Sequence, residues 1–254
     1  MLAEKRRRGI FDIVQNSGSI SNVELARQFN VSVETIRRDI IRLNKNGVVR
    51  RTHGGALSMN SFEPPYADRM SANLESKQAI ARLAASLVPD KASVIIDFGT
   101  TAFCLAEALA NHNGLTIITA SLQAAKFLAG RNGNEVVLMG GQFYPSEGAT
   151  LGRDATQVLE NYFVDFAFVG AGVISHHPWL MDFSREAAEL RALMLKQAIN
   201  SVVLADYTKF NRTAGYRVGN LEEIRFLITD RKLDAMATQS LITYDGEVLI
   251  ADRF

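Results

Sequence analysis

Two hydrophobic patterns divide this chain into two regions. Near the N-terminus apolar residues recur at helical spacing, as in the stripe of Val33, Ile36, Ile40 and Leu43. From residue 75 onward, helical patterns alternate with short and nearly continuous apolar runs. The runs are residues 94–97, 115–119, 135–139, 166–170, 201–205 and 226–229, and the helical patterns are residues 75–87, 102–110, 122–129, 155–162, 186–199 and 232–239. Such runs are typical of strands buried on both faces, so they predict a mostly parallel α/β sheet covered by helices.

A polar stretch separates the two regions. Residues 58–65 read SMNSFEPP, which ends in two prolines and follows neither a helical nor a strand period. We therefore predict a small N-terminal domain over residues 1–57, a linker over residues 58–74 and an α/β domain over residues 75–254.

The N-terminal region has the layout of a winged helix-turn-helix domain. Two short helices are predicted, with a tight connection at residues 30–32. Their ends are marked by residues suited to cap or stop a helix, namely Ser21 or Asn22, Ser32 and Gly47. A basic strand follows and runs into Gly54 and Gly55, the form expected of a wing. The glycine pair would let the backbone approach another surface closely.

The polar side of the second helix and the wing carry the candidate DNA contacts. These residues are Ser32, Glu34, Thr35, Arg37, Arg38 and Arg42 on or before the helix, and Arg50, Arg51 and His53 on the wing. The ordinary alternative is a solvated charged face. The preceding short helix, the tight connection and the second basic cluster favour double-stranded operator DNA as the partner.

Charge supports this division. Residues 1–53 hold 11 Lys and Arg against 5 Asp and Glu, a net charge of +6, while the remainder holds 17 against 22, a net charge of −5. A basic head on an acidic body is the electrostatic footprint of a nucleic-acid module attached to another domain.

The single cysteine, Cys104, excludes an intramolecular disulfide and favours a reducing cytoplasm. It is expected to be buried and structural, because no His partner for a catalytic thiol is apparent. The adjacent His176 and His177 indicate a polar loop rather than a metal site. The longest apolar run, residues 166–174, is far shorter than the ~20 residues that span a bilayer. We therefore expect no metal, no cofactor and no membrane association.

Polar residues gather where the predicted strands end. In a parallel sheet these carboxyl ends lie along one edge, where ligands bind. The candidate ligand-binding residues are Asp97, Gly99, Thr100, Thr101, Ser121, Gly140, Gly141, Gly170, Gly172, Asp206 and Lys209. Gly99–Thr101 opens directly into a helix, and a helix start with glycine and hydroxyl groups favours an anion. Capping and turn chemistry is the alternative, but the convergence of five strand ends favours a small polar, anionic ligand.

The motif VETIRRDI at residues 33–40, followed by RRTHGGA at residues 50–56, resembles the N-terminal signature of the DeoR family of bacterial transcriptional regulators. The second region resembles the sensor domain of that family, which is similar in fold to ribose-5-phosphate isomerase. The resemblance implies a repressor of a carbohydrate-catabolism operon that a phosphorylated sugar or related metabolite releases from DNA. It also implies that Gly99, Thr100 and Thr101 hold the phosphate and that Lys209 adds a positive charge. Gly140, Gly141 and Asp206 would shape the rest of the site.

An enzyme is the main alternative: a sugar-phosphate isomerase with an accessory nucleic-acid-binding head. The isomerases carry acidic residues after the fourth strand, whereas residues 170–173 here hold no carboxylate to move a proton. A phosphotransferase is a further alternative, but the sequence lacks the GxxxxGK[ST] loop that holds the phosphates of a nucleotide in many such enzymes. We therefore expect a regulator and not an enzyme. Because one winged head reads few base pairs, we also expect a homo-oligomer, either a dimer or a tetramer.

Overall fold

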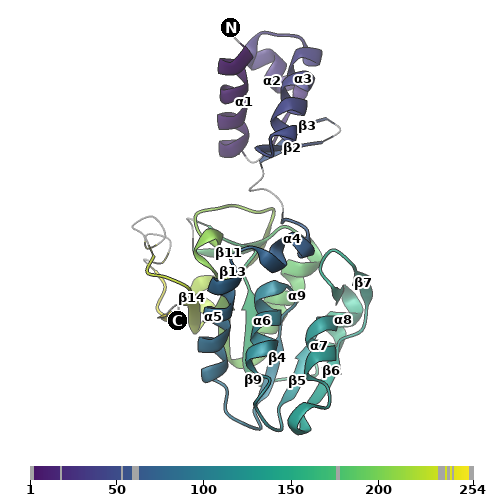
Figure 1. Cartoon of the computed structure of the whole chain (residues 1–254), viewed down its shortest axis with the longest axis vertical. Coiled ribbons are helices and arrows are strands. Elements are labelled where there is room, and N and C mark those ends of the chain that lie inside the picture. The colour runs from purple at the N-terminus through teal and green to yellow at the C-terminus, as the bar shows by residue number, and fades with distance from the viewer. Residues whose placement is uncertain are drawn as a thin grey trace. The chain divides into compact units, whose positions relative to one another are not determined.

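The computed structural model of this chain describes residues 3–17, 19–52, 54–58, 63–175, 178–233, 238, 241 and 243–251. The chain forms two compact units, Met1–Glu63 and Pro64–Phe254, and each is described by itself (Figure 1). The residues predicted as a linker, 58–74, are partly folded in the structure. Ser58 ends a strand of the first unit, and Tyr66–Ser71 forms a helix, α4, at the start of the second unit.

The first unit is a winged helix-turn-helix domain. Its elements are α1 (Ala3–Ser17), β1 (Ser19–Ser21), α2 (Asn22–Phe29), α3 (Val33–Lys45), β2 (Val49–Arg51) and β3 (Gly55–Ser58). The strands form an antiparallel sheet in the order β1-β3-β2. The predicted stripe faces inward: Ile36, Ile40 and Leu43 are buried with Leu25 and Ile10, while Val33 packs against them. Burial of this stripe fixes which face α3 presents to solvent.

Local chemistry sets the ends of these helices as expected. Ser21 caps α2 in a capping box with Glu24, and Ser32 Oγ accepts a hydrogen bond of 3.2 Å from the Thr35 amide to cap α3. Gly47, with φ of 69°, follows the end of α3. Gly55 serves a purpose that the sequence did not reveal: a Cβ there would lie 2.1 Å from Ile20 O. Its close approach is therefore to β1, within the domain.

The second unit is built on a seven-stranded sheet in the order β15-β14-β12-β9-β4-β5-β6, in which every pair is parallel. The strands are β4 (Ser93–Ile96), β5 (Thr116–Thr119), β6 (Glu135–Leu138), β9 (Val164–Gly170), β12 (Ala198–Leu204), β14 (Phe226–Thr229) and β15 (Glu247–Ile250). Chain order reverses between β4 and β9. The carboxyl ends of these two neighbours are therefore the topological switch point, where ligands of such sheets bind.

Helices cover both faces of the sheet, as the sequence predicted. The core on one face includes residues of α5 (Leu74–Ser86), α6 (Thr100–Ala108) and α7 (Leu122–Leu128), and the core on the other includes residues of α8 (Arg153–Leu159) and α9 (Arg185–Lys196). Cys104 is buried in the first of these cores. Figure 1 shows α5 and α6 side by side in front of the sheet.

Several elements differ from the sequence predictions. The helix expected over 186–199 ends at Lys196, because Ala198 already pairs with Val164 in the sheet. The helix expected over 232–239 lies largely outside the described residues. The short strands β1, β7 (Gln142–Tyr144), β8 (Ala149–Leu151), β10 (Val173–Ile174), β11 (Trp179–Asp182), β13 (Tyr216–Asn220) and β15 were not predicted. Of these, β1, β7, β8 and β10 have only two or three residues, which is too few to show a period.

Candidate DNA interface and effector site

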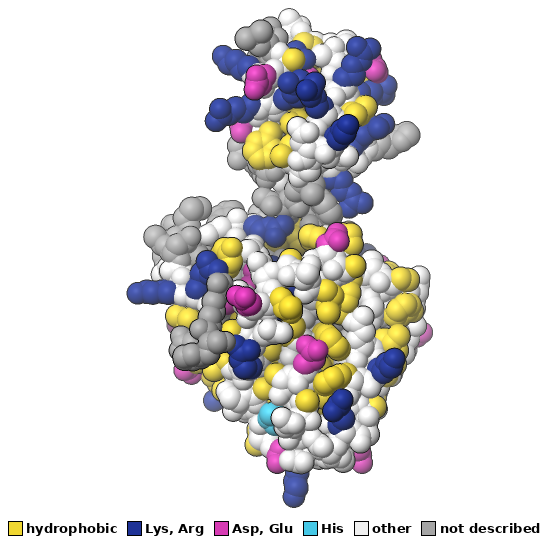
Figure 2. Space-filling view, in the orientation of Figure 1, with side chains coloured by type: hydrophobic (Ala, Val, Ile, Leu, Met, Phe, Trp, Pro, Cys, Tyr) yellow, Lys and Arg dark blue, Asp and Glu magenta, His cyan; other side chains and the backbone are white. Residues whose placement is uncertain are grey.

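The exposed face of α3 carries two arginines that point away from the core. The side chains of Arg37 and Arg38 are 54% and 78% exposed, and each pairs only loosely with Glu34, at 3.7 and 3.6 Å. Exposed pairs at such distances contribute little, so both guanidinium groups can turn to an incoming phosphate or base. Figure 2 shows further Lys and Arg side chains over the visible face of this unit.

Two other predicted contacts on this helix have structural partners. Ser32 and Thr35 bond to each other through their hydroxyls at 2.9 Å in addition to the cap. Arg42 is exposed and lines a groove of about 440 Å³ together with Arg7 and Arg8 of α1. The groove therefore adds two arginines of α1 to the basic surface of this unit.

The wing is joined to α3. Arg51 N donates a hydrogen bond of 2.8 Å to Asn44 Oδ1, which ties β2 to the end of the helix. Arg50 and Arg51 are both exposed on β2, while His53 lies outside the described residues. The wing arginines and α3 therefore belong to one rigid domain.

Asp39, inside the basic motif, is a residue whose role the sequence did not show. It is buried, with Oδ2 2.6 Å from Arg6 Nε and Oδ1 3.6 Å from Arg7 Nη1. This ion pair joins α1 to α3. The motif thus combines outward arginines with an inward carboxylate that holds the helix in place.

In the second unit, a buried ion cluster lies at the switch point. Asp97 follows β4 and receives Arg191 Nε at 2.7 Å, while Arg191 Nη1 also donates to Asp182. The Arg191 guanidinium lies 4.4 Å from the centre of the Phe98 ring. Burial raises the pKa of Asp97, and Arg191 opposes that rise. Asp97, predicted as an effector contact, is fully buried and is already engaged by the protein.

The glycines predicted beside Asp97 serve this cluster. Gly170 N donates a hydrogen bond of 2.8 Å to Asp97 Oδ2, which ties the ends of β4 and β9. A Cβ at Gly172 would lie 2.8 Å from Met181 O, so glycine is needed for close packing of the backbones there. Both residues therefore shape the backbone at the switch point.

The start of α6 is the best anion position among the predicted residues. Gly99, with φ of 97°, is the N-cap, and Thr100 and Thr101 form the first turn with no side-chain cap. Arg69 of α4 lies beside this turn: its Nη1 is 3.7 Å from the position of a Cβ on Gly99. Sequence reasoning missed Arg69 because it placed residues 58–74 in a linker. The two prolines before it suggested a break but gave no hint of the following helix.

Lys77 of α5 is a second cation that the sequence did not single out. It is buried, and this burial lowers the pKa of its ammonium, while the nearby Asp206 opposes that effect and Lys209 and Arg69 add to it. These influences place the two predicted residues, Asp206 and Lys209, within electrostatic reach of Lys77. Asp206 Oδ1 also accepts hydrogen bonds from Thr208 N at 2.9 Å and Asn73 Nδ2 at 3.4 Å.

The remaining predicted residues lie on the β5–β6 side. Ser121 is buried and caps α7 through a 3.2 Å bond from Ala124 N. Gly141, with φ of 121°, packs against Leu151 O, 2.7 Å from where a Cβ would be. Gly140 is exposed and has open space around it. Gly140 and Gly141 are both exposed, whereas Ser121 is closed off from solvent.

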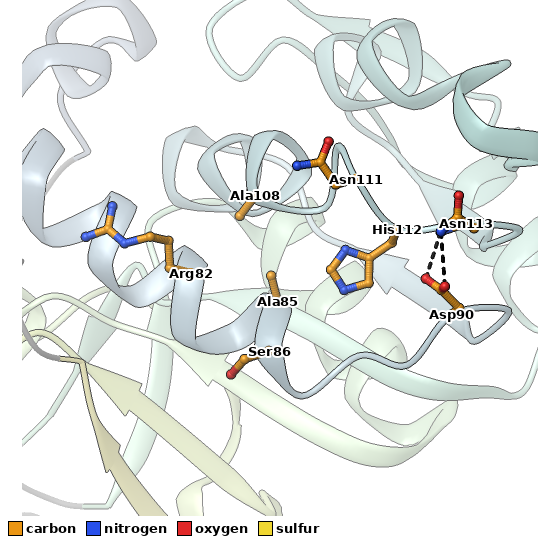
Figure 3. Close-up of a pocket in the computed structure, with 8 residues that line it drawn as sticks. All are labelled: Arg82, Ala85, Ser86, Asp90, Ala108, Asn111, His112 and Asn113. Atoms are coloured by element: carbon orange, nitrogen blue, oxygen red, sulfur yellow. Dashed lines mark hydrogen bonds between the residues drawn. The ribbon is translucent and has the colours of Figure 1, made fainter.

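A separate hollow of about 410 Å³ lies between the C-terminal parts of α5 and α6 (Figure 3). Arg82, Asp90 and His112 line it, and Asp90 accepts bonds from Asn113 N at 2.8 Å and Nδ2 at 3.0 Å. These bonds lower the pKa of Asp90. Its loops precede β4 and β5, so the hollow is at the opposite edge of the sheet from the predicted site.

Among the described residues, no cluster of His, Cys, Asp and Glu has the arrangement of a metal site. In the same part of the chain, each helix is too short or too polar to cross a bilayer.

Comparison with known families assigns both units. Residues 6–62 match the model of the DeoR-like helix-turn-helix domain, and residues 72–231 match that of the DeoR C terminal sensor domain. The chain belongs to the DeoR family. The two matches confirm the resemblance seen in the TIRRD and HGG motifs. They identify the protein as a helix-turn-helix transcriptional regulator.

Curated relatives match nearly the whole length of this chain. The Glycerol-3-phosphate regulon repressor of Escherichia coli (strain K12) is 30% identical over 231 residues, covering 91% of this chain and 92% of that protein. The HTH-type transcriptional repressor GlcR of Bacillus subtilis (strain 168) is 32% identical over 256 residues, covering 100% of this chain and 98% of the relative.

A solved structure of ribose 5-phosphate isomerase A from Methanocaldococcus jannaschii matches 55% of each chain at 23% identity, with a TM-score of 0.40. So distant a likeness carries no functional argument.

Proposed function

We propose that this DeoR-family regulator represses a carbohydrate-catabolism operon and leaves its operator when a phosphorylated sugar or related metabolite binds the second unit. The observation that carries the proposal is the start of α6, where uncapped amides and two threonines lie beside Arg69. Helix N-terminal amides favour an anion, and a guanidinium recognises phosphate oxygens in pairs. Lys77 and Lys209 add further positive charge.

Polar groups near these cations suit the rest of a sugar phosphate. Asp206, Asn73 and Thr208 form a hydrogen-bonded group beside Lys77. Carboxylate and amide groups accept from and donate to sugar hydroxyls. The names of two relatives, a Glycerol-3-phosphate regulon repressor and a repressor called GlcR, support the choice of a carbon metabolite.

The isomerase alternative finds little support in the site. Its proton transfer needs a carboxylate at the carbons that exchange the proton, and Asp206, proposed above to contact the sugar, already accepts hydrogen bonds from Thr208 and Asn73. Asp97 and Asp182, the acids at the switch point, are buried and bonded to Arg191. Incubation with pentose and hexose phosphates, followed by chromatography of the sugars, is expected to show no isomerised product.

On the DNA side, we propose that α3 reads the major groove through Arg37 and Arg38 while Arg50, Arg51 and His53 follow the adjacent backbone or minor groove. We propose that the protein acts in the cytoplasm. We also propose that it is a homo-oligomer, because paired heads on two half-sites supply the affinity that a single head lacks. Light scattering on the purified protein measures the oligomer, and a monomer that binds operator tightly would contradict this.

The effector proposal is tested with Thr100→Val, which removes one hydroxyl and nearly keeps the shape. A thermal-shift screen with sugar phosphates, glycerol 3-phosphate included, first finds the ligand through its stabilisation of the folded state. We expect Thr100→Val to bind operator normally but to need at least about tenfold more of that ligand for release, since a hydrogen bond to a charged group contributes about 1.5–3 kcal/mol. Thr116→Val, at the opposite end of the sheet, is the matched control. Release at the wild-type ligand concentration would place the phosphate elsewhere.

A further inference from the structure

Helix α4 is held on the second unit by side chains at both of its ends. Tyr66 donates a hydrogen bond from its hydroxyl to Gln123 on α7, and Arg69 Nη2 donates to Glu147 Oε2 at 2.6 Å. In addition, Lys77 Nζ on α5 donates hydrogen bonds to the carbonyl oxygens of Arg69 and Ala72, at the end of α4. Because α4 has less than two turns, these contacts and not its own hydrogen bonds determine its position.

The cations that hold α4 are the same ones that flank the anion position. Arg69 Nη1 lies beside Gly99 while its Nη2 is bound by Glu147, and its Nε donates to Pro64 O at 2.9 Å. Lys77 belongs to the same charged group as Asp206 and Lys209 and also holds the end of α4. An arriving phosphate and the helix therefore compete for two cations.

Glu147 is the group that a phosphate would replace. It lies between β7 and β8, and its side chain is 18% exposed where that of Arg69 is 9% exposed. Charged groups this well shielded from water attract one another more strongly than surface pairs. A carboxylate on a guanidinium occupies the donors that a phosphate uses.

We propose that Glu147 is a built-in substitute for the phosphate of the effector, and that the Arg69–Glu147 pair is a latch which the effector opens. This inference rests on the proposed function. When phosphate takes Arg69, α4 loses its attachment to the β7–β8 turn and shifts. Since α4 is the first element of the second unit after the chain leaves the DNA-binding unit at Glu63, its position is the one most directly joined to the head by the backbone.

The test uses Glu147→Gln, which keeps the size of the side chain and removes its charge. Inorganic phosphate is titrated into the full-length protein by calorimetry, up to tens of millimolar. We expect Glu147→Gln to bind phosphate roughly three- to tenfold more tightly than wild type, because the internal competitor is gone. Glu160→Gln, at an exposed position after α8, is the matched control and is expected to bind like wild type.

A second readout follows the switch itself. A duplex selected from a random pool by the wild-type protein is titrated without phosphate. Glu147→Gln is expected to bind this duplex several-fold more weakly, because its latch is open without effector. Glu147→Asp, which keeps the charge but shortens the reach, should behave like Glu147→Gln, and thermal unfolding verifies that both variants fold.

The possible failures are distinct. If wild type and Glu147→Gln bind phosphate equally, the latch is wrong while the proposed phosphate site stands. If phosphate affinity rises but duplex binding is unchanged, Glu147 competes with phosphate without controlling DNA, and the switch is wrong. If neither protein binds phosphate and Thr100→Val still responds to effector, the proposed site fails and the latch with it.

Discussion

At the residue scale, neighbours in the TIRRD motif have opposite tasks. Arg37 and Arg38 are exposed on α3, whereas Asp39, the next residue, is buried against Arg6. A helix places successive residues 100° apart, so one motif can serve a surface and a core at once. Recognition and stability can therefore be separated by single substitutions.

Asp39→Ala is expected to destabilise the first unit by about 3–5 kcal/mol, because it leaves the buried Arg6 without its partner. Hydrogen exchange of the buried amides of α3 measures this loss. Asp12→Ala, at an exposed position on α1, the helix that carries Arg6, should change the stability of the unit by less than about 0.5 kcal/mol. Equal effects of the two substitutions would refute a special role for the Arg6–Asp39 pair.

Arg37→Ala and Arg38→Ala should leave the stability of the first unit unchanged. Each is expected to weaken operator binding by about 1–3 kcal/mol if the arginine reads a base. Fluorescence anisotropy at one fixed salt concentration gives the affinities. Arg82→Ala, an exposed arginine on α5, controls for loss of positive charge. Wild-type affinity in both variants would remove this face of α3 from the interface.

At the element scale, the wing is a short hairpin whose position depends on other elements. Asn44 of α3 bonds to the Arg51 amide, and Gly55 allows β1 to pass close to β3. Because the wing cannot move far from α3, its arginines should contact the DNA backbone next to the groove that α3 enters.

Arg50→Ala and Arg51→Ala are each expected to reduce the magnitude of the log-affinity against log-salt slope by roughly one, because a protein releases about one counterion for each phosphate that it neutralises. Sequence preference should change little. The slope is obtained from titrations over a series of salt concentrations, with Lys126→Ala on α7 as the control for net charge. Slopes identical to wild type would mean that the wing does not touch phosphate.

At the scale of the whole molecule, the proposed switch requires that a ligand bound to the second unit change the DNA affinity of the first. A ligand can change DNA affinity only if it binds one arrangement of the protein more tightly than another. Thermodynamic linkage then requires the reverse effect of equal size.

Saturating operator DNA should therefore raise the dissociation constant of the effector by the same factor by which the effector weakens DNA binding. Calorimetric titration of the effector with and without bound duplex gives one factor, and anisotropy with and without effector gives the other. An effector whose affinity is unaffected by bound operator would not act as an allosteric inducer. In that case the release would come from another ligand.

Local signals in the sequence determined most of the helices and buried strands and the order of the two domains. Caps such as Ser32 and stops such as Gly47 act within a few residues, and burial on one face imposes a period that the sequence records. The exposed arginines of α3 followed directly from the stripe on its other side, and the glycine and threonines at the start of α6 from their place after a strand.

Only the tertiary structure decided which charged groups meet. Arg6 and Asp39 are 33 residues apart, Arg69 and Glu147 are 78 apart, and Arg191 and Asp97 are 94 apart. No periodicity links residues over such distances; the order and register of the strands bring them together. For this reason the sequence showed neither that Asp97 is a buried ion-pair partner of Arg191 nor that Arg69, placed in a linker by the sequence, lies beside the proposed anion site.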